Sequence, residues 1–168
     1  MVIVLMGVAG SGKTSVGEAL VRRLGWPFHD ADDFHSAPNR EKMRRGIPLD
    51  DDDRRPWLEA IRASISQSVS RSENAIYACS ALKRAYRQLL AADIEEVKFV
   101  YLKGSPELIA ERLAGRRGHF FDPALLQTQF NDLEEPHGAL QVNISSPPET
   151  IADSIIACIG LRQGMVGG

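Results

Sequence analysis

The chain has little cysteine, no long apolar run and no excess of charge of either sign. Its two cysteines, Cys79 and Cys158, lie far apart and form neither a C-x-x-C pair nor a zinc-ligand spacing. A disulfide scaffold is therefore excluded, and we expect a cytoplasmic protein in a reduced compartment. The apolar opening Val2–Met6 is too short for a secretory signal or a membrane span, so we expect no membrane association.

The overall charge excludes another group of partners. A formal net charge of -2 and a pI near 6.1 give no positive field of the kind that draws proteins to nucleic acid or anionic lipid. A length of 168 residues with 43% hydrophobic content suits one core, so we expect a single domain over residues 1–168. Its glycine-rich tail, residues 160–168, is expected to be flexible.

Short apolar runs alternate with helical patterns along the chain. The runs are Val2–Met6, Pro27–Asp30, Ala75–Cys79, Val97–Leu102 and Leu140–Ile144. The helical patterns cover about 57–71, 84–92, 106–115 and 148–159, with Pro56 at the start of the first of them. Because this order is that of βαβ units, the sequence predicts an α/β protein with a three-layer α/β/α P-loop NTPase fold and a mostly parallel, five-stranded sheet.

The first strand runs directly into the segment Gly7-Val8-Ala9-Gly10-Ser11-Gly12-Lys13-Thr14. This segment matches G-x-x-x-x-G-K-[ST] between a strand and a helix, the context that the phosphate-binding motif requires. Its glycines let backbone N–H groups converge on phosphate oxygens at the positive end of the helix. We expect Lys13 to bridge the β- and γ-phosphates and the Thr14 hydroxyl to bind Mg²⁺.

The loop by itself does not identify the reaction, because ATPases, GTPases and small-molecule kinases share it. A switch GTPase also needs a guanine-reading N-K-x-D string, which this sequence lacks. Arginines beyond residue 110, followed by Gly118, suggest a helical lid over about 112–135. The sequence therefore favours a small kinase.

Carboxylates follow the second strand, in the segment Asp30-Ala31-Asp32-Asp33. The carboxyl ends of parallel strands meet at one edge of the sheet, so these side chains should face the phosphate loop. If the strand continues, Asp30 and Asp32 lie on the same side, where Asp30 can organise hydrated Mg²⁺ and Asp32 can accept the proton of an acceptor hydroxyl. A helix N-cap in a solvated loop is the alternative interpretation.

From here the chain resembles the signature of gluconate kinases (gluconokinases), small P-loop kinases related to shikimate kinase. The resemblance rests on these residues: His35, Asn39, Lys42-Met43, Gly46, Pro48-Leu49, Asp51, Asp53-Arg54, Pro56-Trp57, Cys79 to Lys83, Tyr86-Arg87, Tyr101-Leu102, Arg112-Leu113, Arg116, Gly118 to Phe121, Leu125-Leu126, Thr128-Gln129-Phe130 and Leu133-Glu134. They extend, in the family's order, over most of the chain.

The resemblance implies ATP- and Mg²⁺-dependent phosphorylation of D-gluconate at its 6-hydroxyl, with a product that feeds the pentose phosphate or Entner–Doudoroff pathway. Gluconate is a polyol with one carboxylate, so its site needs cations at one end and hydrogen-bonding groups along the chain. The acceptor region is expected over about 30–57, and the predicted substrate-binding residues are Asp32, His35, Asn39, Lys42, Arg54, Ser80, Lys83 and Arg87. Arg54 has an alternative role, because it can pair with the acidic run Asp50–Asp53.

The resemblance also assigns residues to the nucleotide. Lys13, Asp32 and Arg116 are the predicted catalytic residues, with Arg116 on the phosphates. Arg112 is placed on the adenine or phosphate side, and Pro147 in an adenine loop that can equally be a plain helix start. Relatives commonly form dimers, although the residues do not reveal whether this chain is a homodimer. A shikimate-type kinase and a nucleotide-binding regulatory protein without catalysis remain the alternative functions.

Overall fold

The computed structural model describes residues 1–91, 93–115 and 123–161 of the chain. In these segments five strands form one sheet in the order β2-β3-β1-β4-β5, and every pairing is parallel. The strands are β1 (Val2–Met6), β2 (Phe28–Asp30), β3 (Ala75–Ala78), β4 (Val97–Lys103) and β5 (Leu140–Asn143). The predicted α/β class and five-stranded sheet are confirmed.

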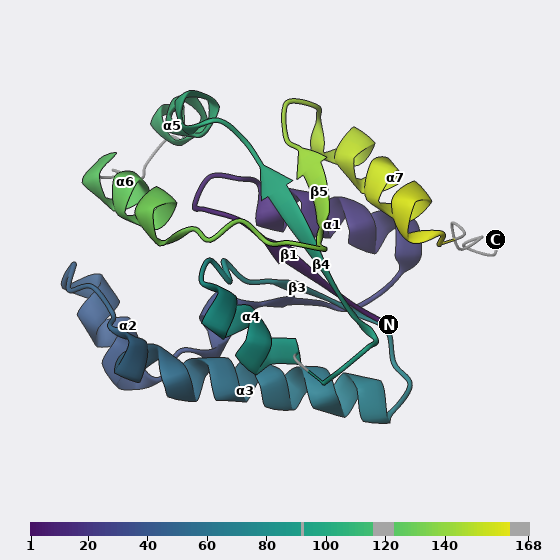
Figure 1. The fold of residues 1–168 in the computed structure, drawn as a ribbon, viewed down its shortest axis with the longest axis horizontal. Coiled ribbons are helices and arrows are strands. Elements are labelled where there is room, and N and C mark those ends of the chain that lie inside the picture. Colours follow the sequence, from purple (N-terminus) through teal and green to yellow (C-terminus); the bar gives the residue numbers. More distant parts are fainter. Residues whose placement is uncertain (92, 116–122, 162–168) are drawn as a thin grey trace.

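Helices cover both faces of the sheet, which gives three layers (Figure 1). The helices are α1 (Lys13–Leu24), α2 (Ala37–Arg44), α3 (Asp51–Ser70), α4 (Arg84–Ala91), α5 (Pro106–Ala114), α6 (Pro123–Asp132) and α7 (Pro148–Ile159). Helices α1 and α7 lie on one side of the sheet and α3 and α4 on the other, while α2, α5 and α6 gather beyond the end that holds the strands' carboxyl termini.

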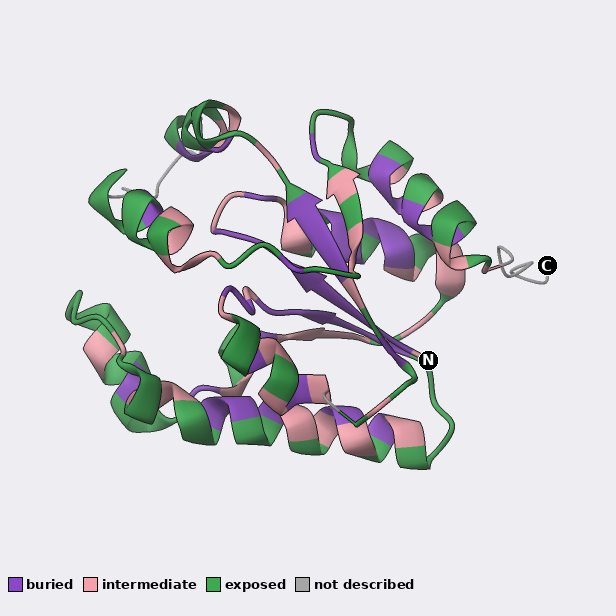
Figure 2. Cartoon of the chain, in the orientation of Figure 1, coloured by how far each residue is buried: buried purple, intermediate pink, exposed green. Residues whose placement is uncertain are grey.

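Alternate residues of the central strand supply the two halves of the core. Ile3 and Leu5 pack with α1 and α7, whereas Val2, Val4 and Met6 pack with α3 and α4. All five side chains are fully buried, and Figure 2 shows β1 purple along its length. A strand covered on both faces must be apolar throughout, which is why this short run could be recognised as a central strand.

The predicted start of the helix over about 57–71 was wrong. Helix α3 begins at Asp51 instead of near residue 57, and Pro56 lies inside it. Asp50 caps the helix by accepting the Asp53 N–H, while the Asp53 carboxylate accepts the Asp50 N–H. This reciprocal capping box satisfies backbone groups at the helix start and fixes that start five residues before Pro56.

The second strand also ends earlier than a continuous strand would require. After Asp30 the chain turns into a 3₁₀ helix, Ala31–Phe34, and the Asp30 carboxylate caps it by accepting the Asp32 N–H at 3.0 Å. Asp30 and Asp32 are therefore not successive side chains on one face of a strand.

None of the helices in the described segments is long and apolar enough to cross a membrane.

Candidate active site

The loop between β1 and α1 has the backbone conformation that its glycines predict. Gly10 and Gly12 have φ values of +79° and +93°, which residues with a Cβ rarely adopt. A Cβ at Gly10 would also lie 2.7 Å from the Leu113 side chain of α5. The loop thus needs glycine for its own turn and for the close approach of α5.

Lys13 begins α1 and turns back over the loop. Its Nζ donates to the carbonyl oxygens of Gly7 and Val8, at 2.9 and 3.1 Å. These contacts hold the ammonium at the mouth of the loop, where the helix start also presents its positive end. The contact of Lys13 with phosphate oxygens stays a prediction.

Two cavities adjoin the loop on different sides. The first, which we call the carboxylate cavity, has a volume of about 270 Å³ and is lined by Lys13, Thr14, Asp30, Asp32, Ser80 and Gln129, among others. The second, the proline cavity, has a volume of about 470 Å³ and is lined by Gly10, Gly12, Arg112, Ser145 and Pro147, among others. The residues predicted to contact the phosphates, Mg²⁺ and the acceptor hydroxyl thus line one cavity. Arg112 and Pro147, the two residues predicted beside the adenine, line the other.

Asp32 stands in a concave site although 86% of its side chain is accessible to solvent. Partial desolvation, together with the nearby charge of Asp30, raises the pKa of the Asp32 carboxyl above 3.8. His35 and Lys13 oppose this shift through their positive charge. The carboxylate is therefore a better proton acceptor than an ordinary aspartate, since a higher pKa means a stronger base.

His35 is buried against the ring of Trp57. The two rings stack with centroids 4.5 Å apart, and the His35 side chain is only 5% exposed. Trp57 is itself fixed by a 2.7 Å bond from its indole N–H to the Ala31 carbonyl. His35 Nε2 lies 4.0 Å from Asp32 Oδ1, so the stack sets the histidine beside the predicted base.

Burial lowers the pKa of His35 below 6.5, against the opposing pull of Asp32. As the pH falls, the unfolded chain therefore takes up this proton first, and stability present above pH 6.5 is lost as the pH drops toward the lowered pKa. We expect His35→Gln to flatten the pH dependence of the unfolding free energy between pH 7.5 and 5.5, by up to about 1.4 kcal/mol per pH unit. Urea unfolding measures this slope, and His137→Gln, at an exposed histidine, is the control that should keep the wild-type slope.

Two cationic side chains predicted to bind the substrate, Arg54 and Lys83, lie around the ring of Tyr86. Arg54 donates to the Tyr86 hydroxyl at 3.1 Å, Tyr86 donates to the Asp51 carboxylate, and Lys83 donates to the same carboxylate at 2.9 Å. The Arg54 and Lys83 charges lie 5.8 and 5.5 Å from the Tyr86 ring centroid. Lys83 contacts the Asp51 carboxylate directly, whereas Arg54 is joined to it through the Tyr86 hydroxyl, so the Arg54 guanidinium has further N–H donors to offer an anionic ligand.

Ser80 belongs to a turn that is fastened to the phosphate loop. Its carbonyl accepts the Gly7 N–H at 3.2 Å, and the next residue, Ala81, has a φ of +44° although it is not glycine. Arg87 donates to the Ala81 and Leu82 carbonyls at 2.9 and 2.8 Å. A backbone held in this region costs about 1–3 kcal/mol, and Arg87 contributes to holding it.

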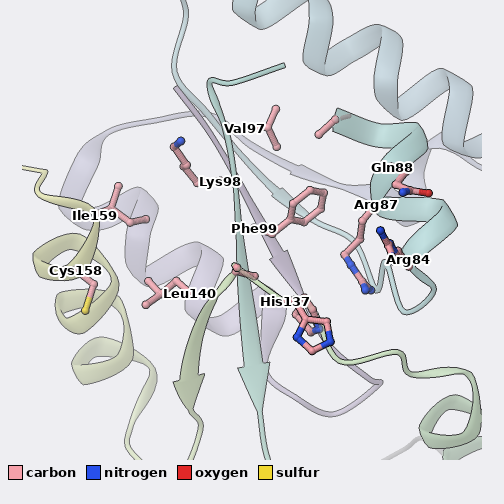
Figure 3. A pocket seen from close by; sticks show the side chains of 14 residues that line it. Arg84, Arg87, Gln88, Val97, Lys98, Phe99, His137, Leu140, Cys158 and Ile159 are labelled. Carbon is pink, nitrogen blue, oxygen red and sulfur yellow. The ribbon is translucent and has the colours of Figure 1, made fainter. Parts of the chain in front are cut away.

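Of the eight predicted substrate-binding residues, Asp32 and Ser80 line the carboxylate cavity and the other six do not. Three of those six make structural contacts elsewhere. Asn39 is buried and donates to the Asp53 carbonyl at 2.7 Å, and Lys42 pairs with the Asp53 carboxylate at 2.7 Å. Arg87 lines a separate cavity of about 750 Å³ between α4 and β4, in which Arg84 and Lys98 also lie (Figure 3). Their assignment to the substrate stays a prediction.

Some residues of the site were not predicted to be there. Tyr86 and Asp51 organise the two cations, and Gln129 lines the carboxylate cavity. All three belong to the family pattern in the sequence, but the pattern gave none of them a role.

Cys79 also lines this cavity, and burial raises its pKa to about 12, so its thiol stays protonated and is no nucleophile. The predicted catalytic Arg116 lies outside the described residues.

Known proteins share both the sequence and this arrangement of elements. A family model described as an AAA domain matches residues 2–136. The thermoresistant gluconokinase of Escherichia coli strain K12 is 41% identical over 162 residues, which cover 94% of this chain and 93% of that protein. A crystal structure of a gluconokinase from Sinorhizobium meliloti 1021 is 43% identical, has a TM-score of 0.82, and is matched over 94% of this chain and 90% of that one.

The chain belongs to the gluconokinase family. The resemblance predicted from the sequence is thereby confirmed, as is the P-loop kinase fold with its nucleotide-binding loop. A shikimate kinase structure from Bacteroides thetaiotaomicron, 17% identical with a TM-score of 0.65, is matched over 96% of this chain and 99% of that one. It shares the fold alone with this gluconokinase-family protein.

Proposed function

We propose that this protein transfers the γ-phosphoryl group of ATP to the 6-hydroxyl of D-gluconate, which yields ADP and 6-phospho-D-gluconate. The observation that carries the proposal is the carboxylate cavity, where the phosphate-loop lysine, Thr14 and two aspartates face one space. Membership of the gluconokinase family supports the choice of acceptor. The product would then supply the pentose phosphate or Entner–Doudoroff pathway.

The residues of the cavity divide the reaction between them. The acceptor oxygen attacks the γ-phosphorus while the bond from that phosphorus to the β,γ-bridging oxygen breaks, and ADP leaves with the electron pair. Asp32 takes the proton of the acceptor hydroxyl, which its raised pKa favours. Lys13 neutralises charge on the phosphates, and Arg116 is proposed to add positive charge on the same group.

Thr14 and Asp30 are proposed to hold Mg²⁺. Both line the carboxylate cavity, and hydroxyl and carboxylate oxygens are the donors that Mg²⁺ prefers when phosphates and water complete its shell. When bound, the ion would neutralise phosphate charge. Asp30 also caps the 3₁₀ helix through Oδ1, so that bond holds the carboxyl group in a fixed orientation.

Arg54 and Lys83 are proposed to bind the gluconate carboxylate. Arg54 lies close enough to His35 for its positive charge to lower the pKa of that histidine, and His35 neighbours Asp32. The cationic cluster is thus linked to the predicted base through one buried ring. An extended acid with its carboxylate at one end and its primary hydroxyl at the other fits this separation of roles.

Arg54→Ala is expected to raise KM for gluconate about tenfold or more, because hydrogen bonds to charged groups contribute about 1.5–3 kcal/mol each. KM for ATP should change little, since Arg54 does not line either cavity beside the phosphate loop. Initial rates at varied gluconate and ATP separate the two effects. Arg55→Ala, at the exposed neighbouring arginine, is the control, and equal changes in both variants would remove Arg54 from the acceptor site.

A coupled assay of ADP release with a panel of acceptors tests the proposed function. We expect release that depends on Mg²⁺ and D-gluconate, and none with shikimate. Release with shikimate and not with gluconate would replace the proposal by a shikimate-type kinase. Nucleotide binding without release on any acceptor would favour the regulatory alternative.

A further inference from the structure

The amide of Ala9 in the phosphate loop already has a partner in this structure. It donates to Oε1 of Gln129 at 2.6 Å, a contact between residues 120 positions apart. A backbone N–H can only donate, so the side-chain atom that faces it must be the carboxamide oxygen. Gln129 thus presents an oxygen to a loop whose amides bind phosphate oxygens.

The position of this contact identifies which phosphate is concerned. Ala9 and Gln129 both line the carboxylate cavity, together with Asp30 and Asp32, and neither lines the proline cavity. A nucleotide whose base lies toward Pro147 must point its terminal phosphate toward the carboxylates. The Gln129 oxygen therefore occupies the end of the loop where the transferred phosphoryl group would lie.

The packing of α6 fixes the glutamine there. Leu126 is buried in the core beside α1 and α7, and Phe130 and Leu133 pack against the same core. Just beyond the helix, the Glu134 N–H donates to the Leu82 carbonyl at 3.0 Å, and Arg87 donates to the Glu134 carbonyl at 2.8 Å. The helix that carries Gln129 is thus fastened to the same turn that Arg87 holds beside the phosphate loop.

We infer that the Gln129 carboxamide contacts the transferred phosphoryl group and makes the phosphate loop distinguish a nucleoside triphosphate from a diphosphate. Its oxygen accepts the Ala9 N–H in this structure, and a γ-phosphate oxygen takes over this bond when a triphosphate enters. The same carboxamide then turns its NH₂ group, a donor, toward the phosphate. This inference rests on the proposed kinase function, because it assumes that ATP is the phosphoryl donor, but it concerns the binding of the nucleotide and not that of the acceptor.

Gln129→Glu is the sharpest test, because it keeps the shape of the side chain and removes the donor. The carboxylate would hold the Ala9 N–H by a stronger, charge-assisted bond and would repel the third phosphate. We expect the Kd of a non-hydrolysable β,γ-imido analogue of ATP, measured by calorimetry with Mg²⁺ present, to rise about tenfold or more. The Kd of ADP should change less than about threefold, which also shows that the loop is folded.

Gln127→Glu is the matched control, since it makes the same change of charge on the exposed side of the same helix, where Gln127 contacts Asn131. It should bind both nucleotides as the wild-type protein does. Wild-type affinity of Gln129→Glu for the ATP analogue would overturn the inference, and so would an equal loss of affinity for both nucleotides. Because no acceptor is present, the result does not depend on whether gluconate is the substrate.

Discussion

Asp32→Asn is expected to lower kcat by about 10²–10⁴-fold, the range in which a general base contributes to proton transfer. Asparagine keeps the size of the side chain but cannot accept the proton of the attacking hydroxyl. KM for ATP should stay close to the wild-type value, because the phosphate loop supplies the nucleotide contacts. Steady-state rates at saturating gluconate measure both quantities.

The pH dependence provides a second readout for this carboxylate. Partial desolvation and the charge of Asp30 raise the pKa of Asp32, so the rate of the wild-type enzyme should begin to fall on the acid side at a pH above that of an ordinary aspartate. The residual rate of Asp32→Asn should lack this acid limb. Asp33→Asn, at the exposed neighbour, is the control for kcat, which should stay at the wild-type value. A kcat within about threefold of wild type would remove Asp32 from the role of base.

Lys13→Met is expected to reduce kcat by about 10²-fold or more, because it removes a preorganised charge from the transferring phosphate. Methionine retains most of the length of lysine, so the helix start should be preserved. The Gly7 and Val8 carbonyls hold the ammonium at the mouth of the loop, where the phosphates are proposed to bind. Single-turnover rates at saturating ATP would measure the loss in the chemical step.

Lys98→Met is the matched control for this variant. Lys98 is an exposed lysine of β4 that lines the cavity beside α4, away from the phosphate loop. The control should keep wild-type kcat. If Lys13→Met retained more than about a tenth of the wild-type rate, the lysine would have no substantial role in stabilising the transferred group.

The phosphate loop could be predicted because its geometry is encoded locally. Gly10 and Gly12 adopt left-handed conformations that the motif itself requires, and the preceding apolar run could only be a central strand. Gly25 ends α1 through equally local chemistry, with a φ of +68° and its N–H donated to the Val21 carbonyl. Short-range chemistry was sufficient at these positions.

Contacts between distant segments could not be predicted in this way. The bond between Ala9 and Gln129 depends on how α6 packs on the core, and no spacing in the sequence expresses that. Lys42 and Asn39 both bind Asp53, so a polar pattern suited to a sugar acid also serves to attach α2 to α3. Family patterns preserve both kinds of residue and do not separate them.

The early start of α3 shows a different limit. Proline is tolerated at the start of a helix, so Pro56 predicts a start near residue 57, but the reciprocal bonds of Asp50 and Asp53 already begin the helix at Asp51. An acidic run can supply caps, charges or ligands. Only the backbone conformation decides which of these each carboxylate supplies.

The central claim is tested most directly by the structure of the product formed from ATP and D-gluconate. The 6-hydroxyl is the only primary alcohol of gluconate, so its phosphate ester has two protons on the adjacent carbon. The account predicts a new ³¹P resonance split into a triplet by those two protons, in an amount equal to the ADP formed. A doublet, which indicates a secondary ester, or ADP formation without any phosphorylated gluconate would contradict it.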